Sequence, residues 1–234
     1  MTGIVIPTYD EAGNIPSLIE RLAPVGATII VVDDGSPDGT ADVAEEHGCT
    51  VLRRAGKQGL ASAYVLGMGH ALDMGCDPII QMDADLSHRP EDVPRLLDAA
   101  EEADLVLGCR WMPGGGTQNW ETSRELLSRF GSAYARLWLG MPFRDLTGGF
   151  KCWRADCLRS IDLPTIRSEG YAFQVETTCR AHRLKGSISE VPILFDDRLS
   201  GLSKMSLGIT LEAATVVPRL RWTTQLPVTS GENE

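Results

Sequence analysis

The sequence predicts an α/β fold in which helices cover both faces of a mostly parallel β-sheet. Within the first 110 residues, short apolar runs alternate with segments of helical pattern. Several of these apolar runs end directly at acidic residues. This alternation is typical of parallel sheets, and ligands of such sheets bind beyond the carboxyl ends of the strands. We therefore expect the acidic residues to gather at a ligand site along one edge of the sheet.

The individual elements of the first half follow from local patterns. Residues 3–7 form a short apolar strand, and residues 14–22 form a helix that accommodates Pro16 in its first turn. Residues 27–32 are a continuous run rich in β-branched side chains, which is typical of a strand buried on both faces. The remaining elements expected here are strands over 50–52, 78–82 and 105–108, and helices over 40–47, 60–74 and 90–103.

The second half of the chain is less regular. We expect a flexible loop at the three glycines 114–116, a long helix over 122–139, and a second helix over 173–184. Short strands and turns fill the rest of residues 140–205. Residues 225–234 lack an apolar pattern and are expected to have no regular structure. The length of 234 residues predicts one domain, over residues 1–224.

Composition limits the classes of function. The chain is 43% hydrophobic and 23% charged, as in an ordinary globular protein, and its net charge of −10 disfavours a nucleic-acid binder. The charge is uneven, at −13 over residues 1–105 and +3 over 106–234. No apolar run is long enough to span a membrane, and the first residues do not resemble a signal peptide. The six cysteines form no CxxC pair, so we expect buried, reduced thiols and a cytoplasmic protein.

Three acidic motifs follow expected strands. Asp83 and Asp85, separated by one residue, can approach one hard divalent cation. Mg²⁺ accepts few protein oxygens and completes its shell with phosphate oxygens and water, so this pair suits a nucleoside diphosphate. Asp33 and Asp34 precede Gly35 and can accept hydrogen bonds from a nucleobase. Each of these two motifs alone is also typical of a solvated or helix-capping turn. The third motif, residues 7–11, is by itself an equally weak indication of a ligand site.

Together, in this order and spacing, the segments PTYDE, VVDDGSPDGT and MDADLSH resemble glycosyltransferase family 2. Within that family they resemble the polyprenyl-phosphate (dolichyl-phosphate) mannose synthases. Further matching segments extend the resemblance over residues 3–205, at 108–111, 119–128, 145–150, 170–176 and 195–204. The implied fold is GT-A, a single Rossmann-like, mostly parallel sheet flanked by helices, with amphipathic helices at the membrane interface. Residues 1–110 would form its nucleotide-sugar and metal half and residues 111–224 its acceptor half.

The resemblance implies an inverting transfer of mannose from GDP-mannose to a polyprenyl monophosphate at the cytoplasmic face of a membrane. Asp83 and Asp85 would bind Mg²⁺ or Mn²⁺. Ser87 stands where family members have glutamine, so the third ligand beside the metal is open between a water molecule and Ser87 itself. The residues implied to hold the base and ribose are Pro7, Tyr9, Glu11, Asp33 and Asp34.

The acceptor phosphate is already an anion and needs no strong general base. It needs cations, and arginine binds phosphate with two parallel hydrogen bonds. The resemblance places here Arg110, Arg124, Arg198 and Lys204, with Ser128 as a further donor. It also places Asp145, Tyr171, Gln174 and Glu176 near the donor sugar, although Glu176 could instead lie on the solvent face of a helix. The residues expected to act in catalysis are Asp85, Arg124, Asp145 and Arg198.

The helix over 122–139 has an apolar side. At 100° per residue its large apolar residues fall within a sector about 120° wide, with Arg129 and Arg136 opposite. This side either packs into the core or lies in a membrane interface, and residues 206–222 repeat the pattern. A lipid-linked acceptor favours the interface for at least one of the two segments, and a membrane-anchoring partner protein would be compatible with it. The apolar residues are Leu126, Leu127, Phe130, Tyr134, Leu137 and Trp138.

Other functions stay open. The same lipid phosphate could receive glucose or an amino sugar. A nucleotide-binding module without catalysis is a rival of another class. The presence of four expected site residues argues against it: Asp83, Asp85, Arg124 and Arg198. A dehydrogenase is disfavoured because no GxGxxG follows the first strand. We expect His88 to shape the metal motif, and neither His88 nor His182 to be catalytic.

Overall fold

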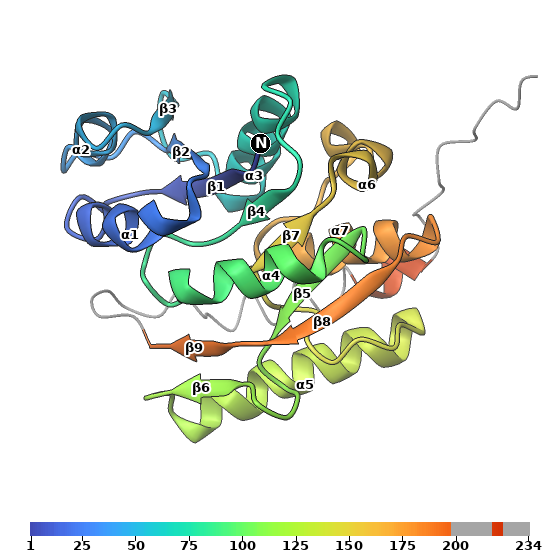
Figure 1. Cartoon of the computed structure of the whole chain (residues 1–234). Coiled ribbons are helices and arrows are strands. Elements are labelled where there is room, and N and C mark those ends of the chain that lie inside the picture. The colour runs from blue at the N-terminus through green and yellow to red at the C-terminus, as the bar shows by residue number, and fades with distance from the viewer. Residues whose placement is uncertain (198–216, 222–234) are drawn as a thin grey trace, which may run out of the picture.

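The computed structural model describes residues 1–197 and 217–221 and is built on a seven-stranded sheet (Figure 1). The strand order is β3-β2-β1-β4-β7-β5-β8. Only β7 runs antiparallel to its neighbours β4 and β5, so the prediction of a mostly parallel sheet is confirmed. The strands are β1 (Gly3–Thr8), β2 (Thr28–Asp33), β3 (Thr50–Arg53), β4 (Ile79–Gln81), β5 (Leu105–Cys109), β7 (Lys151–Trp153) and β8 (Ile188–Pro192).

Helices connect these strands. They are α1 (Ile15–Leu22), α2 (Thr40–Glu46), α3 (Leu60–Asp73), α4 (Val93–Ala99), α5 (Thr122–Leu139), α6 (Ala155–Ser160) and α7 (Gly170–Arg183). Short 3₁₀ turns lie at Ala23–Val25, Pro90–Asp92 and Leu163–Thr165, and residues 217–221 are helical. The helix expected over 90–103 is shorter than predicted, because the chain turns after Ala99 and the Asp104 N–H donates to the Ser187 carbonyl beside β8.

Both faces of the sheet are buried. In β1, Val5 contributes to one apolar cluster, with Tyr64 of α3 and Phe173 of α7. Its neighbours Ile4 and Ile6 contribute to a second cluster with side chains of α1 and α4. In β2, Ile30 and Val32 belong to the first cluster and Val31 belongs to a third. Because alternate residues of a strand point to opposite faces, this confirms the burial on both faces that was predicted for residues 27–32.

The register brings the ends of three strands together. Thr8, the last residue of β1, is paired with Asp33, the last residue of β2. On the other side of β1, Val5 is paired with Gln81, where β4 ends. The segments that follow β1, β2 and β4 therefore leave the sheet at one edge, which is where the sequence places its acidic motifs.

Of the three glycines expected to form a flexible loop, Gly114 lies in a turn and Gly115 outside regular structure, whereas Gly116 departs from the expectation. Gly116 begins a short strand, β6 (Gly116–Gln118), which pairs in parallel with β9 (Leu194–Asp196). A Cβ atom at Gly115 would lie 2.5 Å from the Cys109 carbonyl oxygen, and Gly114 has a φ of +87°. These glycines therefore permit a close approach between backbones.

Two further expectations concern the cysteine thiols and membrane-spanning helices. All six thiols are free, five of them are buried, and Cys49 is half-buried. Within residues 1–197 and 217–221, no helix combines the length and apolar character needed to cross a membrane.

Candidate functional site

A cavity of about 270 Å³ opens at the carboxyl ends of β1, β2 and β4. Its lining confirms that the acidic motifs, far apart in the sequence, share one crevice. The lining residues are Pro7, Thr8, Tyr9, Glu11, Asp34, Lys57, Gly59, Leu60, Ala63, Asp83, Ala84 and Asp85. Six of the residues that the sequence assigns to the nucleotide or the metal are among them.

The neighbouring aspartates after β2 have different roles. The Asp33 carboxylate is buried and accepts hydrogen bonds from the Thr8 hydroxyl, the Gly35 N–H, and both the N–H and hydroxyl of Ser36, at 2.6–3.1 Å. Asp33 therefore orders the loop and does not line the cavity. Asp34 does line it, and its Oδ1 lies 2.7 Å from Nη1 of Arg54.

Arg54 and Lys57 belong to the site and were missed by the sequence reasoning. Arg54 is paired with Asp34, and Nζ of Lys57 lies 4.1 Å from the centre of the Tyr9 ring, a cation–π contact. Both residues follow β3, the next strand along the same edge of the sheet. Their position after a predicted parallel strand, in a segment with Gly56 and Gly59, is the signal that could have found them.

The metal motif follows β4 directly. The Asp83 N–H donates to Nδ1 of His88 at 3.0 Å, and the Tyr64 hydroxyl donates to Oδ1 of Asp83 at 2.8 Å. The His88 ring is stacked on Phe150, with a centroid distance of 4.9 Å. His88 thus holds the backbone of the motif, in agreement with the shaping role expected for it.

Asp83 and Asp85 fit a divalent cation that is shared with a diphosphate. Both carboxylates line the cavity, and in the described part of the chain no group of three or more His, Cys, Asp or Glu side chains gathers to enclose a metal. A hard cation bound here would complete its shell with oxygens of substrate and water. The Ser87 hydroxyl donates to Oδ1 of Asp85, so Ser87 orients this carboxylate.

Asp145 and Arg110 form a buried ion pair. Nε of Arg110 donates to Oδ2 at 2.7 Å, and Nη2 donates to Oδ1 at 2.8 Å. Burial alone would raise the pKa of the Asp145 carboxyl, but the guanidinium outweighs it and the pKa is lowered. The sequence assigns Arg110 to the acceptor phosphate, whereas in the structure its guanidinium is buried and bound to Asp145.

Arg124, which the resemblance assigns to the acceptor phosphate, lies in the first turn of α5. Its Nη1 lies 2.6 Å from Oδ1 of Asp197, and its guanidinium stacks over the Trp120 ring at 4.0 Å. Ser128 is one turn further along α5, on the same side of the helix. Arg198 and Lys204, the other two cations assigned to this side, lie outside the described residues.

The first turns of α7 bring Gln174 towards the metal motif. Oε1 of Gln174 accepts from Gln81 at 2.8 Å. A Cβ atom at Gly149 would lie 3.5 Å from Nε2 of Gln174 and 3.7 Å from Oδ2 of Asp83, so these two polar groups converge beside Gly149. Tyr171, at the start of α7, is half-buried.

Glu176 does not lie on a solvent face, which corrects that alternative. It is buried, and its Oε1 lies 2.6 Å from Nη2 of Arg180, while Oε2 accepts from the Ser168 N–H. The contact with Ser168 joins α7 to the segment before it, and the contact with Arg180 lies within α7.

Comparisons with known proteins agree with this geometry. The model of the family "Glycosyl transferase family 2" matches residues 3–161. An "Undecaprenyl-phosphate mannosyltransferase" of Micrococcus luteus is 48% identical, covering 92% of this chain and 91% of its own. A "Polyprenol monophosphomannose synthase" of Mycolicibacterium smegmatis is 42% identical, covering 88% of this chain and 81% of its own.

Solved structures show the same fold at low identity. Glucosyl-3-phosphoglycerate synthase from Mycobacterium tuberculosis, in complex with phosphoglyceric acid, matches 94% of this chain and 78% of its own, with a TM-score of 0.70 and 19% identity. The same enzyme in complex with Mn²⁺, UDP and glucosyl-3-phosphoglycerate gives a TM-score of 0.68 at 20% identity, over 93% of this chain and 77% of its own.

The sheet order and the likeness to these solved structures show the GT-A fold. The chain belongs to glycosyltransferase family 2. The resemblance found in the sequence is thereby confirmed at the level of fold and family.

Proposed function

We propose that the protein transfers mannose from GDP-mannose to a polyprenyl monophosphate, with inversion at the anomeric carbon, and releases GDP. The observation that carries this proposal is the 48% identity, over 92% of the chain, to a protein named as an undecaprenyl-phosphate mannosyltransferase. The crevice supports it, because carboxylates at the ends of parallel strands suit a nucleoside diphosphate and its cation.

On the donor side, Pro7, Tyr9, Glu11 and Asp34 bind the base and ribose, and Asp33 keeps their loop in place. Asp83 and Asp85 hold Mg²⁺ or Mn²⁺. When bound, this cation neutralises charge on the diphosphate that leaves as GDP.

On the acceptor side, the lipid phosphate attacks the anomeric carbon in line. Arg124 and Ser128 hold this phosphate on the side of α5 that carries the Asp197 contact. Arg198 and Lys204 are assigned here by resemblance alone. Asp145 is assigned to the sugar by resemblance, and Arg110 keeps its carboxylate ionised and oriented.

Access to a lipid comes through α5. Its apolar side is not in the core, because Leu126, Phe130 and Leu137 are 63%, 68% and 80% exposed. The buried side of the helix carries the small residues Ser132 and Ala135. The apolar side therefore suits the interface of a membrane, and we place it at the cytoplasmic face.

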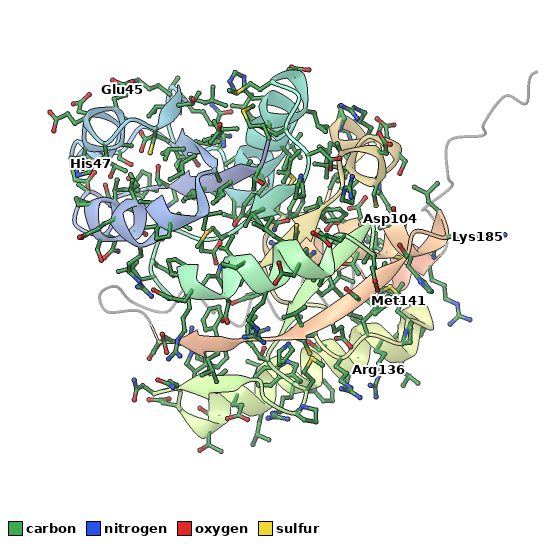
Figure 2. The ribbon with its side chains drawn as sticks, viewed as in Figure 1. Glu45, His47, Asp104, Arg136, Met141 and Lys185 are labelled. Atoms are coloured by element: carbon green, nitrogen blue, oxygen red, sulfur yellow. The ribbon has the colours of Figure 1, made fainter. Side chains whose placement is uncertain are left out.

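A groove of about 630 Å³ lies at the C-terminal end of α5. Its lining includes Arg136 and Met141, which are labelled near the right-hand end of α5 in Figure 2, together with Leu137. Lipid-facing apolar groups next to a cation suit the boundary between acyl chains and phosphate headgroups.

The test is incubation of the purified protein with labelled GDP-mannose, Mg²⁺ and undecaprenyl phosphate, followed by extraction into organic solvent. We expect label in the organic phase that depends on all three components. UDP-glucose and UDP-N-acetylglucosamine serve as parallel donors. Lipid product only from one of these would replace mannose in the proposal, and no product from any donor would favour the nucleotide-binding module.

A further inference from the structure

We propose that Tyr64 is a positioning residue for the metal motif, because its hydroxyl fixes the carboxylate of Asp83. The inference rests on the proposed function, since it needs a cation at Asp83 and Asp85. It concerns a residue of α3 that lies outside the three acidic motifs.

The placement of Tyr64 is set by packing. The side chain is fully buried in the apolar cluster between α3 and the sheet, and its ring stacks on Phe173 of α7 at 6.0 Å with an interplanar angle of 3°. A buried phenol needs a hydrogen-bond partner. Here the hydroxyl donates to Oδ1 of Asp83 at 2.8 Å, so an apolar ring carries a polar group to the edge of the donor cavity.

Two contacts then fix Asp83. The backbone N–H is held by Nδ1 of His88, and Oδ1 is held by Tyr64. Oδ2 is directed towards Gly149, where the amide of Gln174 also lies. Groups that orient metal-binding side chains in this way contribute strongly to metal affinity. Without the hydroxyl, the ring packing on Phe173 would remain, but the carboxylate could rotate.

The test is Tyr64→Phe, with Tyr134→Phe on α5 as the matched control. Binding of Mn²⁺ in the presence of GDP is followed by electron paramagnetic resonance of the free ion. We expect the dissociation constant for Mn²⁺ to rise by about ten- to a hundredfold in Tyr64→Phe, and to change less than threefold in the control. A change below threefold in Tyr64→Phe overturns the inference and leaves the proposed function standing. If the wild type itself does not retain Mn²⁺ with GDP, both fall.

A second variant separates positioning from packing. Phe173→Leu removes the ring that Tyr64 stacks on but keeps the hydroxyl, so we expect a lower melting temperature and Mn²⁺ affinity within threefold of the wild type. An equal loss of Mn²⁺ affinity in Tyr64→Phe and Phe173→Leu would show that packing sets the site, and would overturn the inference.

A measurement without a change at Tyr64 covers the case in which Tyr64→Phe does not fold. The chain has four tyrosines, and replacing Tyr9, Tyr134 and Tyr171 by phenylalanine leaves Tyr64 alone. Titration of this variant with Mn²⁺ and GDP should give a tyrosine band in the ultraviolet difference spectrum, because the cation draws charge from the carboxylate that the hydroxyl contacts. Mn²⁺ binding without that band overturns the inference.

Discussion

Lys151 of β7 is a buried lysine whose pKa can be tested through the pH dependence of the protein's stability. Its side chain is buried, and Nζ donates to the Gln174 carbonyl at 2.8 Å and to the hydroxyls of Thr177 and Thr178 at 3.1 and 3.0 Å. Among the described residues no carboxylate forms an ion pair with it. Burial lowers the pKa of Lys151 to about 7, against a smaller opposing effect of Asp145. We therefore consider the variant Lys151→Met.

The direction in which the free energy of unfolding changes with pH follows from the protons bound by the folded and unfolded states. In the unfolded chain a lysine has a pKa of about 10.4, so above about pH 7 the unfolded state holds a proton that the folded state has lost. Stability then rises with pH, with a slope approaching about 1.4 kcal/mol per pH unit. Between about pH 7 and about pH 8.5 this amounts to about 1 to 2 kcal/mol. Above that window the buried thiols act in the opposite direction, because burial raises the pKa of Cys152 and Cys157 to about 12.

Lys151→Met has nearly the same length and no titrating group. The hydroxyls of Thr177 and Thr178 still donate to the Gln174 carbonyl, so the change leaves these groups paired. We compare the two proteins by subtracting the free energy of unfolding of the wild type from that of the variant. This difference should fall by about 1 to 2 kcal/mol between about pH 7 and about pH 8.5, because only the wild type gains stability from the loss of the Lys151 proton.

The assay is urea unfolding of both proteins at several pH values inside this window. Lys185→Met is the matched control, because Lys185 is exposed (Figure 2) and its replacement should leave the pH dependence of the wild type unchanged. If the free energies of unfolding of wild type and Lys151→Met run parallel from about pH 7 to about pH 8.5, the lowered pKa is refuted.

Three further predictions concern the reaction and the membrane. Asp85→Asn should lower transfer by at least about a hundredfold, and full wild-type turnover in EDTA would contradict the role given to the metal motif. Arg124→Ala should reduce catalysis about ten- to a hundredfold with GDP affinity nearly unchanged by calorimetry, and a loss of GDP affinity of that size would place Arg124 on the donor side. Replacing Phe130 and Trp138 by serine should reduce flotation with anionic liposomes by about tenfold or more without loss of the folded state, since both rings are exposed; unchanged flotation of the folded variant would exclude α5 as the membrane contact.

Local patterns in the sequence were enough for the elements that place the donor crevice. The helix expected over 122–139 matches α5 at both ends, and the strand expected over 27–32 is displaced by one residue from β2. Apolar periodicity and turn residues are properties of short segments, so they can be read without knowing the fold. Because parallel strands end at a common edge, the order of elements also predicted that Asp34, Asp83 and Asp85 would line one cavity.

Which of two adjacent residues faces a ligand depends on contacts across the sheet. Asp33 and Asp34 are chemically identical, yet the pairing of β1 with β2 brings the Thr8 hydroxyl to Asp33 and turns Asp34 towards the cavity. In the same way, Arg110 and Asp145 are separated by 35 positions and meet only in the folded chain. Patterns along the sequence cannot report such pairs, because the partner comes from another element.

The sequence by itself determined the fold class, the common edge at which the parallel strands end, and the acidic residues of the donor side. The tertiary structure alone decided that β7 enters the sheet between β4 and β5, that Glu176 is buried against Arg180, and that the apolar side of α5 is exposed. Helical periodicity is the same for a core-facing and a membrane-facing helix. Only the packing of Ser132 and Ala135 against the body of the protein shows which side of α5 is buried and which side is exposed.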